Sequence, residues 1–331
     1  MNEASRSLLS VRKLVKHFPV ASSFHFKIRG PKDNKVVHSV DNVSFDIMRG
    51  DALGILGESG CGKTTLGRTI LLLTNPTSGT VWFDGQEITT LTKKELRNVR
   101  RNMQIVFQDP VSSLDPRMRT KDIVLEPLKA TGEHDSNVLA ESAINAVESV
   151  GLDSEHLDRF PHEFSGGQRQ RIGIARALIT KPKFVVFDEP TSALDASIQA
   201  QVLNLIQDLQ NESNLSSLYI SHDVNVVRYM SNRVAVMYLG KIVEICDADK
   251  IMTSPMHPYT IALISSVPKR DPKRRHDDDA IIMGEPPSAI DPPSGCRYRT
   301  RCPYSTSKCE EEPMLLELKK GHYVSCHFPL T

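Results

Sequence analysis

The sequence predicts an α/β protein with an inserted helical subdomain, and three observations support this prediction. An apolar strand over 51–56 leads into a glycine-rich loop and then into a helix over 65–72, which is the order of a common α/β unit. Further apolar strands end in polar residues at 103–108, 183–189 and 218–222. The region from about 120 to 160 has helical periodicity and no strand signal.

Length, charge and composition narrow the class of protein. At 331 residues the chain can form more than one lobe. Its 41 basic and 40 acidic residues leave a net charge of +1, so no overall field favours nucleic acid or anionic lipid. There is no signal-peptide pattern near the start of the chain and no run of 18 apolar residues. We therefore expect a cytosolic protein that does not itself span a membrane.

The glycine-rich loop is the most informative stretch. It fits the pattern G-x-x-x-x-G-K-[ST], in which glycines let successive backbone N–H groups face an anion. The helix that follows adds partial positive charge, Lys63 adds a full charge, and the Thr64 hydroxyl is placed for Mg²⁺. We expect the whole loop to bind nucleotide phosphates. Its residues are Gly57, Glu58, Ser59, Gly60, Cys61, Gly62, Lys63, Thr64 and Thr65.

Before and just after this loop, the pattern predicts further strands. Strand signals occur at 8–18, 36–47 and 79–85, followed by an exposed helix over 93–101. Phe18 ends the first strand. It is either a core residue or an aromatic plate that stacks on a purine ring.

Polar residues at the ends of the later strands predict a catalytic site at that edge of the sheet. The reason is that α/β sheets bind ligands beyond the carboxyl ends of their strands. Asp188 and Glu189 end a buried strand, which is costly unless a metal or hydrogen bonds use the carboxylates. Such an aspartate can hold Mg²⁺ and such a glutamate can orient an attacking water. Gln108 and His222 end the neighbouring strands, although a surface amide and a structural histidine are the alternatives.

A second anion cradle is predicted at Ser165, Gly166, Gly167 and Gln168, where a serine and two glycines open a helix. An ordinary N-cap is the alternative. A turn at 192–195 then leads into an amphipathic helix over 197–210, and 234–244 predicts a hairpin around Leu239-Gly240.

The tail is rich in cysteine. A charged linker over 269–279 precedes Cys296, Cys302, Cys309 and Cys326, whose spacing lacks the C-x₂-C pairs of common zinc ribbons. Four thiolates suit an iron–sulfur cluster or zinc, and unligated thiols are the third alternative. We expect the other two cysteines, Cys61 and Cys246, to be packing residues.

Together these motifs resemble the ATP-binding cassette (ABC) family. The likeness rests on five motifs in order: the loop at Gly57, Gln108, the Ser165 motif, Asp188-Glu189 with 192–195, and His222. Within the family, the chain is similar to the ATPase subunits of oligopeptide and dipeptide importers. That narrower likeness rests on 108–117, on His-Pro-Tyr-Thr at 257–260 and on the cysteine-rich tail, and the resemblance covers roughly 8–328.

The resemblance implies a domain plan and a set of cofactors. A phosphate-loop nucleotide-binding domain would occupy 1–250, with an antiparallel β subdomain and with the helical subdomain at about 110–165. A cysteine-rich, importer-specific extension would occupy 251–331. ATP and Mg²⁺ are the implied cofactors. The tail resembles those that carry a [4Fe–4S] cluster, so the four tail cysteines are expected to hold one, with zinc as the alternative.

The resemblance also implies roles at the nucleotide. Two cassettes would pair head to tail, so that ATP lies between the phosphate loop of one and the Ser165 motif of the other. Phe18 would stack on adenine, and Thr64, Gln108 and Asp188 would serve Mg²⁺. Glu189 would polarise the attacking water, and His222 would contact the γ-phosphate.

The implied partners are a second homologous ATPase subunit in a heterodimer and two transmembrane permease subunits, which would dock partly at 109–117. An extracytoplasmic solute-binding protein would act indirectly, and no nucleic acid is expected. The chain would lie peripherally on the cytoplasmic face of the membrane and power di- or oligopeptide import. Alternatives are another cargo (nickel, glutathione or oligosaccharide), or a soluble ABC ATPase that acts as a mechanical clamp.

Overall fold

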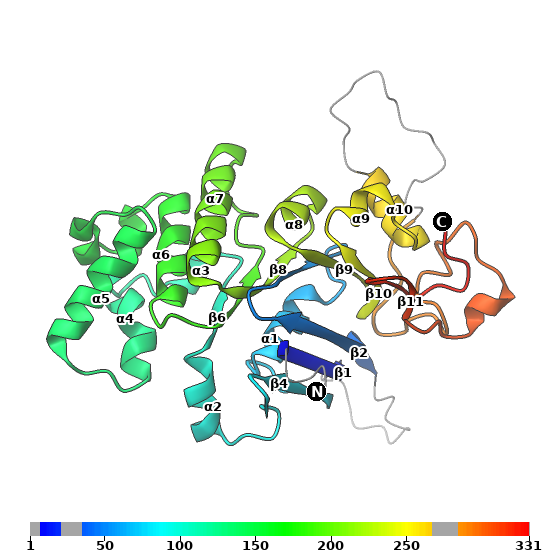
Figure 1. Ribbon diagram of the computed structural model, residues 1–331, viewed down its shortest axis with the longest axis horizontal. Coiled ribbons are helices and arrows are strands. Elements are labelled where there is room, and N and C mark those ends of the chain that lie inside the picture. Colours follow the sequence, from blue (N-terminus) through cyan, green and yellow to red (C-terminus); the bar gives the residue numbers. More distant parts are fainter. Residues whose placement is uncertain (1–6, 21–34, 267–283, 331) are drawn as a thin grey trace, which may run out of the picture. The chain divides into compact units, whose positions relative to one another are not determined.

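The computed structural model describes residues 7–20, 35–266 and 284–330 (Figure 1). The charged linker predicted at 269–279 lies outside these residues. The chain forms two compact units, and each is assembled from segments that are far apart in sequence. The first comprises Met1–Ser10, Asp46–Leu53 and Trp82–Ser221, and the second comprises Val11–Phe45, Gly54–Val81 and His222–Thr331.

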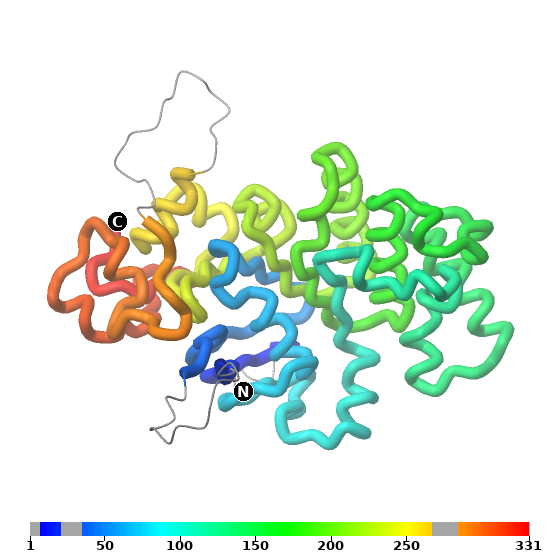
Figure 2. Tube along the Cα trace, turned by 180° about the vertical axis from the view of Figure 1, so that it is seen from behind, coloured from blue at the N-terminus to red at the C-terminus, as the bar shows by residue number. Residues whose placement is uncertain are grey.

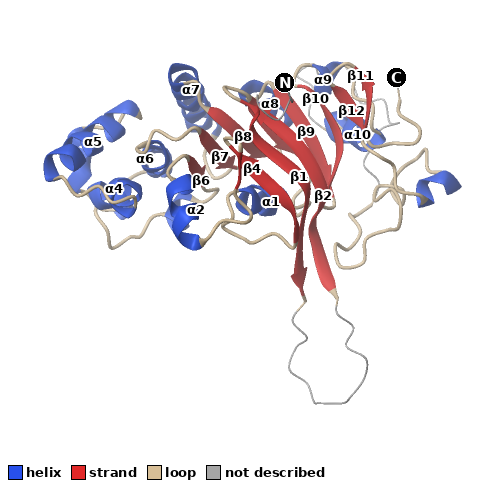
Figure 3. Ribbon diagram, turned by 60° about the horizontal axis from the view of Figure 1, so that its bottom comes forward, coloured by secondary structure: helices blue, strands red, loops and turns tan. Residues whose placement is uncertain are grey.

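The predicted antiparallel β subdomain is present as a four-stranded sheet in the order β2-β1-β4-β5. Its long strands β1 (Ser7–Pro19) and β2 (Val36–Met48) lie side by side in Figure 3. In β2, buried residues alternate with more exposed ones from Val43 to Ile47, which is typical of a strand with one covered face. Strand β4 (Ser78–Phe83) pairs antiparallel with the two-residue strand β5 (Gln86–Glu87).

The first unit contains three parallel strands, β6 (Met103–Val106), β7 (Phe184–Asp188) and β8 (Ser216–Ser221), in the order β8-β7-β6. Every residue of β7 and β8 is buried. Continuous apolar runs such as Phe-Val-Val-Phe in β7 are expected for parallel strands that are covered on both faces. The residues at the ends of these strands are therefore held by a rigid core.

The helices of the first unit confirm the predicted helical region. Helices α4 (Thr120–Ala130), α5 (Ser136–Ser149) and α6 (Gly166–Leu178) lie together in Figure 1. Leu125, Leu128 and Ala143 form a small core between α4 and α5. The remaining helices of this unit are α2 (Lys93–Arg100), α3 (Pro110–Ser113), α7 (Ala196–Ser213) and the 3₁₀ helices η2 (Ser154–Asp158) and η3 (Pro161–Glu163).

The second unit contains the predicted hairpin, formed by β9 (Arg233–Tyr238) and β10 (Lys241–Asp247). The turn residues Leu239 and Gly240 both have positive φ, at 42° and 82°, as tight two-residue hairpin turns require. The same unit holds α1 (Lys63–Ile70) and α8 (Val224–Met230). No helix in the described part of the chain is both long and apolar enough to cross a membrane.

The tail packs on this hairpin. Strand β12 (His322–Val324) pairs antiparallel with β10 and with β11 (Leu316–Lys319). Helices α9 (Lys250–Thr253) and α10 (Pro258–Ser265) lie beside the tail in Figure 2, and the 3₁₀ helix η5 (Ser307–Glu310) completes it. Tyr259 and Tyr298 share one apolar core with β9 and β10.

A buried carboxylate anchors the tail, and the sequence reasoning missed it. Glu244 on β10 is fully buried and accepts hydrogen bonds from the amides of Met256 (2.8 Å) and His257 (2.9 Å). Its Oε1 lies 2.6 Å from His322 Nε2. Burial alone would raise the pKa of Glu244, but hydrogen bonds, with that to His322 the strongest, lower it below its usual value.

His257 caps α10 and must stay neutral to do so. Its Nδ1 accepts the Tyr259 amide at 3.1 Å, and burial lowers its pKa to about 4. The unfolded chain, with an ordinary histidine pKa near 6.5, therefore binds a proton that the folded chain rejects between these values. Stability from this group is fully present above about pH 6.5 and is lost as the pH falls towards about 4.

We expect the free energy of unfolding to fall on acidification from pH 7 to 4.5, with His257 contributing on the order of 3 kcal/mol. Chemical denaturation at several pH values measures this slope. His257→Asn keeps a capping acceptor but does not titrate, so it should flatten the slope. His134→Asn, at an exposed position, should not. An unchanged slope in His257→Asn would show that another group controls the acid sensitivity.

Candidate active site

The phosphate loop connects β3 (Ala52–Leu56) to α1 and curls tightly around the side chain of Lys63. Lys63 is 5% exposed, and its Nζ donates to the carbonyls of Gly57 (2.7 Å) and Glu58 (2.9 Å). Gly60 and Gly62 have φ of 78° and 107°, a region that glycine adopts without strain. The ammonium is therefore held at the loop, where an anion would meet backbone N–H groups and a full positive charge.

Two loop glycines lie against neighbouring backbone. A Cβ at Gly57 would lie 2.2 Å from the carbonyl oxygen of Met237, and a Cβ at Gly62 would lie 1.9 Å from that of Ser39. Gly60 has no such neighbour within 4 Å. The loop therefore keeps its shape through contact with β2 and β9 as well as through its own turns.

Phe18 is exposed rather than part of the core. Its residue exposure is 37%, and Lys16 Nζ lies 4.7 Å from its ring centroid. This excludes the core alternative and leaves an aromatic face accessible. Stacking on adenine remains a prediction.

The strand ends of the first unit bring Gln108 and Glu189 together. Gln108 Nε2 donates to Glu189 Oε2 at 3.0 Å, while Asp188 is 1% exposed at the end of β7. Glu189 has a φ of 46°, and its amide donates to the Ile220 carbonyl of β8 at 3.0 Å. A left-handed backbone at a non-glycine residue costs energy and is concentrated at functional sites. The sequence carried no signal for this conformation.

The Ser165 motif forms a reciprocal capping box at the start of α6. Ser165 Oγ accepts from the Gln168 amide at 3.3 Å, and Gln168 Oε1 accepts from the Ser165 amide at 3.0 Å. The predicted serine cap is confirmed. Gly167 is needed for packing, because a Cβ there would lie 2.4 Å from Ile198 Cγ2 on α7.

The predicted site residues divide between the two units. The phosphate loop, Phe18 and the exposed His222 belong to the second unit. Gln108, the Ser165 motif, Asp188 and Glu189 belong to the first. The roles assigned to individual residues remain predictions.

Comparison with known proteins decides the family. The family described as "ABC transporter" matches residues 40–192, and "Oligopeptide/dipeptide transporter, C-terminal region" matches 243–309. A putative peptide import ATP-binding protein of Brucella ovis is 48% identical over 320 residues, which is 96% of this chain and 97% of that protein. The chain belongs to the ABC transporter family. The predicted family and fold class are therefore confirmed.

Other ABC proteins are similar to this chain in sequence or in fold. The oligopeptide transport ATP-binding protein AppF of Bacillus subtilis is 46% identical over 326 residues, covering 97% of each chain. A dimeric ATP-binding cassette solved with ADP and phosphate after hydrolysis has a TM-score of 0.63 at 27% identity, covering 72% of this chain and 98% of that one. Cassette cbiO1 of Clostridium perfringens has a TM-score of 0.63 at 25% identity, covering 75% and 92%. This chain is an ATP-binding ATPase of the ABC type.

The iron–sulfur cluster expected in the tail is wrong. The C-terminal family is described only as a transporter region, and the matched relatives are named as ATP-binding proteins, so nothing in the comparisons supports a cluster. The four cysteines do line one pocket, together with His257 and Tyr298. Burial raises the pKa of Cys296, Cys302 and Cys326, the last to about 11, which favours neutral thiols.

The zinc alternative fits no better. Sulfurs around one zinc ion lie about 3.8 Å apart, whereas in the described tail no three of the four sulfurs lie within 4.8 Å of one another. The prediction rested on the four cysteines and on the family resemblance, and neither of these reports how the tail packs. Tyr259 and Tyr298 share the core of β9 and β10. The predicted packing role of the other cysteines holds, since Cys61 and Cys246 are both buried.

We expect Gly62→Ala to abolish nucleotide binding and to cost about 2–4 kcal/mol of stability, because the new methyl group collides with the Ser39 carbonyl. Gly60→Ala is the matched control. Its φ is also positive but its surroundings are open, so it should cost only the backbone penalty of about 1–2 kcal/mol. For each variant, denaturant unfolding measures the stability and nucleotide titration measures the binding. Equal stability losses in the two variants would show that close packing does not shape the loop.

Proposed function

We propose that this ABC ATPase powers the import of di- or oligopeptides. The observation that carries the proposal is the full-length likeness to peptide import and oligopeptide transport ATP-binding proteins, tail included. The tail match also favours an importer over a soluble clamp. It favours peptides over nickel, glutathione or oligosaccharides as the cargo.

The chemistry proposed for the site is ATP hydrolysis by positioning and electrostatics. Lys63 and the loop amides hold the phosphates, and Phe18 stacks on the adenine. Glu189 orients the attacking water, and the amide of Gln108, 3.0 Å from its carboxylate, holds that carboxylate in place. His222 contacts the γ-phosphate.

The proposed Mg²⁺ ligands carry the type of donor atom that this ion prefers. Mg²⁺ prefers oxygen donors and keeps several waters. The Thr64 hydroxyl, the Gln108 amide oxygen and the Asp188 carboxylate are such donors, acting directly or through water. When bound, the ion neutralises charge that develops on the phosphates.

The proposed assembly pairs this chain with a second, homologous ATPase subunit. Each nucleotide then lies between the phosphate loop of one subunit and the Ser165 motif, residues 165–168, of the other. Two permease subunits carry the pore, and an extracytoplasmic solute-binding protein delivers the cargo. The assembly places this chain on the cytoplasmic face of the membrane.

Residues 109–117 form the proposed permease contact. Asp109 is the N-cap of helix α3, and its side chain accepts the amides of Val111 (2.8 Å) and Ser112 (3.3 Å). Val111 is 59% exposed, so the segment offers an apolar side chain on a short capped helix. The predicted boundary at residue 250 between cassette and extension is retained as part of the proposal.

We expect Glu189→Gln to lower steady-state ATP hydrolysis in the assembled transporter at least about a hundredfold while ATP binding is retained, because the group that orients water is lost. Glu148→Gln, at an exposed position on α5, is the matched control and should hydrolyse ATP normally. Phosphate release measures ATP hydrolysis, and nucleotide titration measures ATP binding. Near-normal turnover by Glu189→Gln would remove this residue from the mechanism.

We expect the purified chain alone to hydrolyse ATP slowly, at a specific rate that rises with protein concentration. Each composite site needs the Ser165 motif of a second cassette, so an isolated subunit is incomplete. Co-expression with its homologous partner and the permeases should raise the rate and yield a complex that copurifies. A high rate that does not depend on concentration would contradict this assembly.

A further inference from the structure

Residues of α10 and of the tail contact the phosphate loop at Glu58, and these contacts involve none of the predicted catalytic groups. Arg301 Nη1 donates to both carboxylate oxygens of Glu58, at 3.2 and 3.1 Å. The hydroxyl oxygen of Tyr259 on α10 accepts the Glu58 amide at 3.0 Å. One loop residue is thus held through both its side chain and its backbone by residues that follow position 250.

Arg301 is itself immobilised. Its side chain is 6% exposed, Nη1 also donates to the Tyr238 hydroxyl at 3.2 Å, and Nη2 donates to the Gly284 carbonyl at 3.0 Å. The rings of Tyr238, Tyr259 and Tyr298 pack together, with centroids 4.6 to 5.3 Å apart. A buried, charge-assisted contact of this kind is stronger than a surface ion pair.

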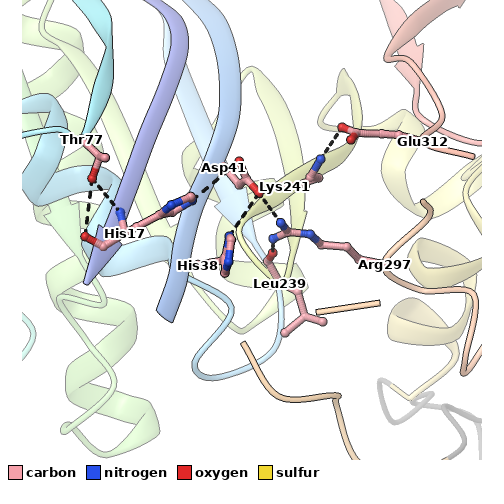
Figure 4. A network of polar contacts seen from close by, with 8 residues as sticks. All are labelled: His17, His38, Asp41, Thr77, Leu239, Lys241, Arg297 and Glu312. Carbon is pink, nitrogen blue, oxygen red and sulfur yellow. Dashed lines mark hydrogen bonds and ion pairs between the residues drawn. The ribbon is translucent and has the colours of Figure 1, made fainter. Parts of the chain in front are cut away.

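A second tail arginine supports the loop from the hairpin side. Arg297 donates to the Leu239 carbonyl and to the Asp41 carboxylate (Figure 4). The next residue of that turn, Gly240, donates its amide to the Cys61 carbonyl of the loop at 2.8 Å. Gly240 also accepts the Asp41 amide at 2.8 Å, which ties β2 to the same turn.

We propose that Tyr259 and Arg301, supported by Arg297, are positioning residues that hold the phosphate loop in its anion-binding shape, so that the tail sets nucleotide affinity. N–H groups that are already in place bind an anion without the free-energy cost of ordering the loop. Arg301 also neutralises Glu58, a carboxylate within the loop that would otherwise repel a polyphosphate. The inference rests on the proposed function only in that this loop binds nucleotide.

The test uses the full chain and ADP as the probe, with affinity measured by titration calorimetry. We expect Arg301→Met to weaken ADP binding on the order of tenfold, because a charged contact is lost and Glu58 is left unpaired. Adding Glu58→Gln to this variant should restore at most part of the affinity, because it removes the unpaired charge while the loop still lacks its contact with residue 301. In the assembled ATPase, Arg301→Met should raise KM with little change in kcat.

Arg228→Met is the matched control. It breaks an ion pair in the same unit, between Arg228 and Asp249, whose side chains are 47% and 86% exposed. It should bind ADP like the wild type. If Arg301→Met folds poorly, Tyr259→Phe removes only the acceptor for the Glu58 amide and should still weaken ADP binding.

Wild-type affinity in Arg301→Met, or full restoration of wild-type affinity by Glu58→Gln, would overturn the proposal. If Arg301→Met fails to fold, wild-type affinity in Tyr259→Phe would do the same. Absence of ADP binding by the wild-type chain would instead contradict the proposed function. The two failures are therefore distinguishable.

Discussion

The tight backbone packing around the phosphate loop is the constraint on which the rest of the second unit depends. Gly57 and Gly62 leave no room for a methyl group against the carbonyls of Met237 and Ser39. Strands β9 and β2 must therefore lie within van der Waals distance of the loop. Because β9 pairs with β10, and β10 pairs with β12, the position of the loop is linked through the sheet to the last strand of the tail.

The tail is held by ordinary packing and by buried hydrogen bonds. Glu244 would be costly to bury alone, but three donors satisfy it, two of them backbone amides next to α10. Tyr259 and Tyr298 add apolar area to the core of the hairpin. A segment that packs its apolar side chains into the core of a neighbouring hairpin can fold without a core or a metal centre of its own.

The strand ends of the first unit show how a rigid core presents reactive groups. Asp188 ends the fully buried strand β7, which pairs with β6 and β8, and the amide of the next residue, Glu189, donates to the Ile220 carbonyl of β8. The left-handed backbone of Glu189 and its hydrogen bond from Gln108 then define where the carboxylate lies. This arrangement suits an ATPase, in which positioning supplies most of the catalysis.

The sequence by itself determined the features that depend on local backbone requirements. These were the phosphate loop with its glycines, the Ser165 cap, the hairpin at Leu239-Gly240 and the acidic end of β7. It did not determine the contact of Glu58 with Arg301, 243 positions apart, or that of Glu244 with His322, 78 positions apart. It was also misled about the cysteines, because their spacing says nothing about the neighbouring core. Only the tertiary structure decided these points, since a partner across such a separation is selected by the packing of the whole unit and by no local pattern.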